Sequence, residues 1–215
     1  MKKNNLVLLL IAALIVSACN FWGVRGNGRI KSETRNILDF EKIDAGGAFS
    51  IKIKVGPSTS LRIVAEENLI GYIRTNVKGN TLVIDTRKNV SPRKEIIIEI
   101  TTPSLKSVDA SGANNIYIDG INGAEFRVEL SGAGNIDLRG TVDKFRAELS
   151  GAGNIDARDL IAKEVRVSVS GAASADVHAK EYLEASVSGV GSIDYYGNPA
   201  KVKTDVSGVG SISRK

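Results

Sequence analysis

Four aspartates recur at nearly constant spacing in the second half of the chain, and they are the residues with the clearest potential for chemistry. They are Asp137, Asp156, Asp176 and Asp194, separated by intervals of 18 to 20 residues. Carboxylates that lie close together can act as the acid and the base of glycoside cleavage, and their oxygen atoms are suitable ligands for Ca²⁺. A polysaccharide-cleaving enzyme and a cation site are therefore two hypotheses for these aspartates.

The position of the aspartates within the surrounding motif favours a simpler role. Each belongs to a repeated motif, whereas a catalytic group normally interrupts a repeat. In calcium-binding repeats of the form GGxGxDxUx the aspartate follows the glycine by two residues, but Asp137 follows Gly134 by three, which places it outside and Ile136 inside. We interpret the set as a solvated column, with a cation site as the alternative. We expect Arg139 and Arg158 to moderate the repulsion between the like charges.

Other reactive side chains are scarce in this sequence. His178 is the only histidine and Cys19 the only cysteine, so neither a two-histidine metal site nor a cysteine cluster can form, and we predict no metal or cofactor. Tyr195 and Tyr196 could stack on a sugar, but one of two neighbours in a strand points inward. A phosphate-binding loop needs a helix after its glycines, and none is expected here. We therefore assign no catalytic residue.

The aspartates lie within a repeat that begins with the dipeptide Ser-Gly. Its six copies read SGANNIY, SGAGNID, SGAGNID, SGAASAD, SGVGSID and SGVGSIS, and they start at residues 111, 131, 150, 170, 188 and 207. A period of about 19 residues held over six copies is typical of a solenoid, in which each repeat forms one coil.

The glycines of the motif predict a corner in each coil. The second position is always glycine, which suits a positive φ or a close approach to a neighbouring chain segment. The fourth position is glycine in four copies, Asn114 in the first and Ala173 in the fourth. Because asparagine tolerates the left-handed region better than most residues, we expect a left-handed bend at this position, with Ala173 as the exception.

Hydrophobic and polar residues alternate on both sides of the corner, which indicates two short strands in each repeat. Val128 and Leu130 precede the corner, and Ile136 and Leu138 follow it. Parallel stacking of equivalent strands would bury a shared core, and the aligned serines and asparagines would hydrogen-bond from coil to coil. One predicted core column contains Ile116, Ile136, Ile155, Ala175, Ile193 and Ile212.

The sequence therefore predicts an all-β fold in which residues 105–215 form a parallel β-helix-like solenoid of about 19-residue coils. Residues 29–104 lack the repeat, but the segment IDAGGAFSI at 43–51 echoes VDASGANNI at 108–116. We expect residues 29–104 to begin with a degenerate coil and to form an N-terminal β-rich cap. At the C-terminal end Arg214 and Lys215 guard an open strand edge, unless a second copy covers it and makes a homo-oligomer.

The composition agrees with a regular β protein and argues against nucleic-acid binding. The chain has 22 glycines but only 5 phenylalanines and 1 tryptophan among 215 residues. Its formal net charge is +5, and two of the lysines lie in the N-terminal segment. The remaining basic residues are scattered among acidic ones, without the basic stripe and interleaved aromatics of a nucleic-acid interface. We predict no nucleic-acid partner.

The first residues have the pattern of an exported lipoprotein. Lys2 and Lys3 precede an apolar stretch at 6–16 that is too short to span a bilayer. The letters VSAC at 16–19 resemble the bacterial lipobox, whose cysteine receives a lipid and becomes the new N-terminus. We predict a lipoprotein signal peptide at 1–18, lipid attachment with palmitate at Cys19, and a tether at 19–28. A membrane would then be a partner through the N-terminal lipid.

The glycine corners, the IDAGGAFSIKI segment and the lipobox together resemble the bacterial envelope proteins of the putative autotransporter adhesin, head GIN domain family. The resemblance covers about residues 38–213, and the SGAGNID and SGVGSID copies are its most specific part. The copies at 170 and 207 depart from this form. The resemblance implies a β-helix-like solenoid and an adhesive role, and it brings no catalytic residue.

We therefore expect a non-catalytic adhesin or binding module that a lipid anchors in the cell envelope, at the outer membrane of a Gram-negative bacterium, facing the periplasm or the cell surface. Regularly spaced serine, asparagine, aspartate and arginine would bind a glycan or a protein through many weak contacts. The alternatives are a polysaccharide-active β-helix enzyme and a purely structural envelope protein.

Overall fold

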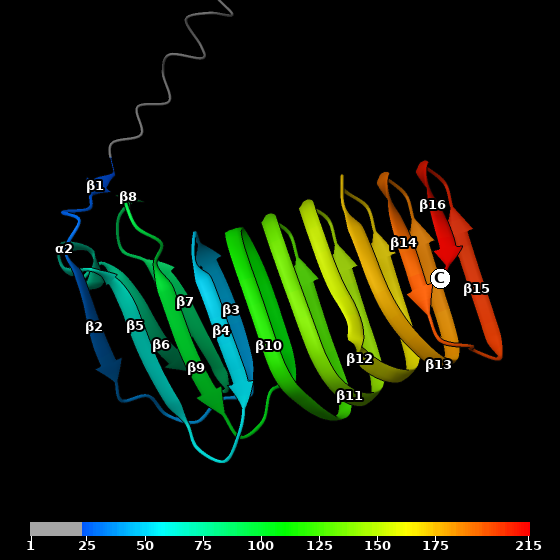
Figure 1. Cartoon of the computed structure of the whole chain (residues 1–215), viewed down its shortest axis with the longest axis horizontal. Helices are drawn as coiled ribbons and strands as arrows, with labels where there is room; N and C mark the ends of the chain where they lie inside the picture. The colour runs from blue at the N-terminus through cyan, green and yellow to red at the C-terminus, as the bar shows by residue number, and fades with distance from the viewer. Residues whose placement is uncertain (1–22) are drawn as a thin grey trace, which may run out of the picture.

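The computed structural model describes residues 23–215, which form a β-solenoid of stacked coils with one short helix (Figure 1). The predicted signal peptide, the lipid site at Cys19 and the first part of the tether lie outside the described residues. Within residues 23–215 no helix combines the length and the apolar character that crossing a membrane requires.

Each coil of the repeat half contributes one strand segment to each of two facing sheets. Segments that precede a Ser-Gly motif form the leading sheet, and segments that follow it form the trailing sheet. All neighbouring strands in this half pair in parallel. The strands are β10 (Ser107–Leu130), β11 (Ala133–Leu149), β12 (Ala152–Val169), β13 (Ser174–Val187), β14 (Val190–Tyr196), β15 (Lys201–Val206) and β16 (Val209–Arg214). The predicted parallel solenoid is confirmed.

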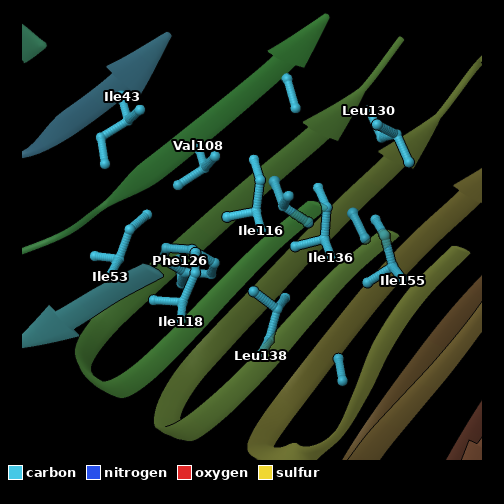
Figure 2. Close-up of a cluster of buried hydrophobic side chains, with 14 of the residues drawn as sticks. Ile43, Ile53, Val108, Ile116, Ile118, Phe126, Leu130, Ile136, Leu138 and Ile155 are labelled. Atoms are coloured by element: carbon cyan, nitrogen blue, oxygen red, sulfur yellow. The ribbon is translucent and has the colours of Figure 1, made fainter. Parts of the chain in front are cut away.

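The core lies between the two sheets and consists of columns of equivalent residues. Ile136 pairs with Ile155 in register, as the 19-residue period predicts. Figure 2 shows Ile116, Ile136 and Ile155 side by side among the buried side chains. Phe126 and Phe145 form another column, with stacked rings whose centres are 6.3 Å apart. Because no coil can bury its apolar residues alone, stability depends on the stacking of neighbours.

The glycines at the corners are required mainly by close backbone packing. A Cβ on Gly151 would lie only 1.8 Å from the carbonyl oxygen of Gly132 in the preceding coil. Among the second-position glycines of the six motifs, Gly112 has a positive φ, of 83°. No residue other than glycine within 23–215 has a positive φ. The expected left-handed bend at Asn114 is therefore wrong, and Ala173 needs no special explanation.

Asn114 instead joins the first corner to the cap. Its side chain is 1% exposed. The Oδ1 atom accepts a hydrogen bond from the N–H of Phe49 at 3.1 Å, and Nδ2 donates to the carbonyl oxygens of Ala45 at 3.3 Å and Ser111 at 2.5 Å. Buried polar atoms without hydrogen-bond partners would destabilise the fold. The asparagine is therefore explained by its hydrogen bonds rather than by its backbone conformation.

The N-terminal cap contains the predicted degenerate coil, which directly neighbours β10 but follows β2 (Ile30–Arg35) in the chain, so the cap does not begin with it. Its strands β3 (Lys42–Gly47) and β4 (Ser50–Val55) lie parallel to β10, with Ile43 opposite Val108 and Ile51 opposite Ile116. This is the alignment that the echo between residues 43–51 and 108–116 predicts, and that expectation is confirmed.

Antiparallel strands complete the cap and end the parallel stack. In the trailing sheet, β9 (Ile97–Thr102) lies parallel to β4, and β5 (Ser60–Glu66) and β2 (Ile30–Arg35) follow in antiparallel pairs. In the leading sheet, β7 (Thr81–Thr86) lies parallel to β3, and β6 (Ile73–Lys78) is antiparallel to β7. The helix α2 (Glu67–Ile70) follows β5, and a separate pair joins β1 (Val24–Arg25) to β8 (Val90–Ser91).

The described part of the predicted tether is held against the cap by Glu66. The carboxylate of Glu66 is fully buried. It accepts hydrogen bonds from the N–H groups of Gly28 at 2.5 Å, Arg93 at 2.7 Å and Lys94 at 3.4 Å. Burial is the largest influence and raises the pKa of Glu66, but the N–H donors together hold this pKa below its ordinary value. Glu66 therefore fixes where the N-terminal segment leaves the cap.

The Gly151→Ala substitution should strongly destabilise the fold. Its methyl group would collide with the backbone of the preceding coil, and we expect a loss of about 2 kcal/mol or more, or roughly 4–8 °C in Tm. Thermal unfolding measures the effect. Gly71→Ala is the matched control, because Gly71 has an ordinary φ of −66° and nothing within 4 Å of the added methyl group. Equal effects of the two substitutions would contradict the proposed packing constraint.

The Glu66→Gln substitution should weaken the protein at neutral pH and matter less in acid. Because the folded pKa of Glu66 is lowered from 4.5, the ionised carboxylate stabilises the fold above about pH 4.5, and this contribution disappears as pH falls through the folded pKa. Urea unfolding at pH 7 and pH 3 should show the difference between wild type and variant shrinking with acid. The exposed neighbour Glu67, replaced by glutamine, is the control. A difference that grows in acid would refute this assignment.

Candidate functional site

The outer face of the trailing sheet carries the four predicted aspartates as one continuous row, here called the acidic column. Asp137 lies opposite Asp156, Asp156 opposite Asp176, and Asp176 opposite Asp194 on successive coils. The neighbouring isoleucines point into the core. The prediction that these aspartates align and face outward is therefore confirmed. Consecutive aspartates of the column lie on paired strands whose backbones are about 5 Å apart.

Two basic side chains form ion pairs with aspartates of the acidic column. The guanidinium of Arg158 donates from two nitrogens to the carboxylate of Asp156, with Nε 2.9 Å from Oδ1. At the other end of the column, Nζ of Lys215 lies 3.2 Å from Oδ2 of Asp194. The expected role of Arg158 is confirmed.

Arg139, which was expected to act in the same way, is directed elsewhere. Its Nε lies 3.7 Å from Oδ2 of Asp159, and its guanidinium lies over the ring of Tyr117, 5.2 Å from the ring centre. Arg139 helps to lower the pKa of Asp156 only as a more distant charge. Sequence spacing alone could not distinguish these two arginines, because each follows an aspartate by two residues.

The environments of neighbouring aspartates shift their pKa values in opposite directions. The hydrogen bonds from Arg158 lower the pKa of Asp156. Partial burial raises the pKa of Asp176, and the nearby charges of Asp156 and Asp194 add to this rise. Within residues 23–215 no ion pair engages Asp137 or Asp176. These two carboxylates are therefore available to accept hydrogen bonds from a ligand.

A row of amides and hydroxyls runs beside the acidic column, next to the corners. Asn135 donates to Asn115 at 3.3 Å, and Asn154 donates to Asn135 at 3.1 Å, from coil to coil. The hydroxyl of Ser170 donates to the carbonyl oxygen of Leu149 at 3.3 Å. The predicted coil-to-coil hydrogen bonding is confirmed, and the exposed asparagine ladder also presents a regular polar surface to solvent.

The remaining candidate residues lie at the end of the acidic column. The Nδ1–H of His178 donates to the carbonyl oxygen of Arg158 at 3.1 Å. Tyr195 packs against the core, and Tyr196 lies in register with His178 on the outside. As the sequence suggested, one tyrosine of the pair points inward. Across the described part of the chain, no three histidine, cysteine, aspartate or glutamate side chains are grouped so that they could hold a metal ion.

The aromatic ring at the start of the acidic column borders a surface hollow. Tyr117 lies opposite Lys52 on one side and Asp137 on the other, where the trailing sheet passes from the cap to the solenoid. The hollow has a volume of about 430 Å³, and Tyr117, Lys52 and Asp119 are among the residues that line it. The acidic column thus continues into a hollow bordered by Tyr117, whose ring lies under the Arg139 guanidinium.

The leading sheet carries a second hollow, which the sequence analysis did not single out. A groove of about 540 Å³ crosses its outer face, where Arg146, Arg166 and Glu184 contribute to the lining. Its charges pair across coils: Arg146 with Glu125 at 3.0 Å and Arg166 with Glu184 at 3.2 Å. The signal was present in the sequence, because the arginines at 127, 146 and 166 repeat with the solenoid period.

Comparisons with known proteins agree with the predicted resemblance. The model of the family described as "Putative auto-transporter adhesin, head GIN domain" matches residues 39–199. The crystal structure of a putative adhesin from Bacteroides fragilis is similar, with 28% identity and a TM-score of 0.75, over 90% of this chain and 100% of that chain. No curated protein matches the chain.

Two further crystal structures share the fold. A putative adhesin from Parabacteroides merdae has 23% identity and a TM-score of 0.55, over 90% of this chain and 99% of that chain. A putative lipid binding protein from Parabacteroides distasonis has 23% identity and a TM-score of 0.51, over 89% of this chain and 99% of that chain. At this level of identity the likeness concerns the fold alone.

Proposed function

This chain belongs to the family described as "Putative auto-transporter adhesin, head GIN domain", and we propose that it is a non-catalytic binding module held at the cell envelope by a lipid on Cys19. In this proposal the outer face of the trailing sheet binds an extended, hydroxyl-rich chain such as a glycan. The contacts are individually weak and are repeated from coil to coil.

The observation that carries this proposal is the register of the acidic column. Stacking places the same type of acceptor on four successive coils. Asp137 and Asp176 have no ion pair within the described residues, whereas the arginines in the groove of the leading sheet are paired with glutamates. Unpaired carboxylates can exchange water for ligand hydroxyls without first breaking a protein contact. The trailing sheet is therefore the better binding face.

The chemistry around the acidic column suits a glycan. Carboxylates accept hydrogen bonds from hydroxyls, and the asparagine ladder both donates and accepts. At the start of the column Tyr117 lines the hollow, and the Arg139 guanidinium over its ring adds further donors. Several such contacts along one extended chain act together, so that the whole binds more tightly than any single contact would allow. A protein ligand is the alternative that the binding experiment distinguishes.

One observation favours an enzyme as a second candidate. The pKa values of Asp156 and Asp176 are shifted apart, as in the acid and base of a two-carboxylate mechanism. However, Arg158 occupies both oxygens of Asp156, which leaves this carboxylate poorly placed to attack or to activate water. The family and the similar structure from Bacteroides fragilis are described as putative adhesins, not as enzymes. We therefore favour binding without turnover.

Replacing Cys19 by alanine tests the lipid anchor. The lipid can attach only to a cysteine thiol, and Cys19 is the only cysteine in the chain. We expect Cys19→Ala to abolish palmitate labelling and to move the protein from the membrane to the soluble fraction. Asn20→Ala, a change at the adjacent residue, should keep both labelling and membrane association. Labelling that survives in Cys19→Ala would show that the anchor has been misassigned.

Replacing both Asp137 and Asp176 by alanine tests the binding face. We expect affinity for a glycan identified on an array of envelope and host glycans and proteins to fall at least about tenfold, because two charged hydrogen-bond acceptors are lost. The measurement is calorimetry or surface binding, together with an assay for cleavage products of the bound glycan.

A matched double variant on the opposite sheet provides the control. Glu148→Ala with Glu164→Ala also removes two carboxylates but lies on the leading sheet, so it should retain wild-type affinity. Release of shortened glycan by the wild-type protein would favour the enzyme. If only the leading-sheet variant loses affinity, the ligand binds the leading sheet, and the proposed binding face on the trailing sheet is wrong.

A further inference from the structure

The C-terminal end of the solenoid exposes an unusual share of apolar side chains. Six large hydrophobic residues within 23–215 are exposed, and four of them lie between residues 190 and 209. These are Val190 at 63%, Val202 at 43%, Val206 at 46% and Val209 at 77% exposure. Val190 and Val209 occupy the third position of the Ser-Gly motif, which is exposed in every copy, so the exposure that is specific to this end is that of Val202 and Val206.

Two of these valines are core residues that lack a covering neighbour. Val202 and Val206 on β15 continue the columns of Leu183 and Val187, both of which are fully buried. The outer edge of β15 also has no strand beside it among the described residues. At the opposite end of the molecule, the antiparallel strands and the helix of the cap close the stack (Figure 1). The C-terminal end therefore has both unpaired backbone groups and uncovered core columns.

We propose that a second copy of this chain covers this end, with β15 paired antiparallel to β15 of the partner subunit about a twofold axis at Thr204. Twofold pairing of a strand with its own copy is necessarily antiparallel, and it supplies backbone hydrogen bonds to both edges at once. The two solenoids then share one continuous leading sheet.

The sequence of β15 is complementary to itself in this register. Strand pairing about Thr204 places Val202 opposite Val206 of the partner subunit, so the uncovered core columns meet twice. It also places Lys203 opposite Asp205 of the partner subunit, twice, on the outer face. A register centred on Lys203 would instead oppose two lysines, which cross-strand electrostatics disfavour.

The charge pattern of the leading sheet supports the same partner. Coils in this sheet are linked by ion pairs, and the last of these joins Nζ of Lys203 to Oε1 of Glu184 at 2.6 Å. Asp205 has no ion pair within residues 23–215. In the dimer, Asp205 of each copy meets Lys203 of the other, and the ladder of ion pairs continues across the interface.

Cross-linking in intact cells tests the proposal with the full chain. Because paired residues across antiparallel strands have Cα atoms about 4.5–5.5 Å apart, Thr204→Cys on two copies should form a disulfide under mild oxidation. We expect a band at twice the chain mass. Two controls should give no such band. One is the wild-type chain, whose one cysteine is Cys19. The other is Thr141→Cys, which places a cysteine at an exposed position away from β15.

Charge reversal provides a second test that does not depend on folding defects. Asp205→Lys and Lys203→Asp, each combined with Thr204→Cys, should each reduce the dimer band roughly tenfold, because like charges then face each other. Expressing the two variants together should restore the band, since every lysine of one strand then faces an aspartate of the other in the mixed pair.

Two results would overturn the proposal. One is a Thr204→Cys dimer band no stronger than that of Thr141→Cys. The other is a cross-link at a mass that does not correspond to two chains, which would show that a different protein covers this end.

Discussion

The whole structure depends on how closely one coil can approach the next at its corner. At Gly151 a side chain would meet the carbonyl oxygen of Gly132, and the same type of contact recurs at the equivalent glycine of each copy. Only glycine permits the backbone of every coil to follow that of the preceding coil at strand-pairing distance. The corner thereby fixes the register, and the register decides which side chains lie above one another.

The same register creates both the core and the proposed binding face. Once Ile136 lies over Ile155, Asp137 must lie over Asp156 on the other side of the strand. Because the surface repeats, carboxylates of like charge lie in one row and repel one another. Two ion pairs reduce this repulsion, one between Arg158 and Asp156 and the other between Lys215 and Asp194. Since Asp137 and Asp176 lack such partners within the described residues, the unneutralised carboxylates alternate with neutralised ones along the acidic column.

The parts of the structure that follow from the period could be predicted from the sequence, and the parts that depend on particular side-chain contacts could not. The period and the alternation within each repeat predict the stacking of the isoleucines and the outward aspartates, and the similarity of two segments predicts the alignment of residues 43–51 with 108–116. By contrast, the motif alone favours a backbone role for Asn114, whereas its amide hydrogen-bonds to the cap. Arg139 and Arg158 have the same spacing but different partners, because Tyr117 and Asp159 compete for Arg139.

The two ends of the solenoid differ: one end holds the N-terminal segment, and the other end exposes an unpaired strand. Glu66 fixes the N-terminal segment to the cap end, whereas the uncovered strand β15 lies at the far end (Figure 1). A dimer through β15 therefore places the two N-terminal segments at the outer ends of a particle two solenoids long. If each carries a lipid on Cys19, the acidic columns lie between two attachment points. In the proposed dimer the two apolar ends cover each other, whereas a monomer exposes its apolar end to solvent.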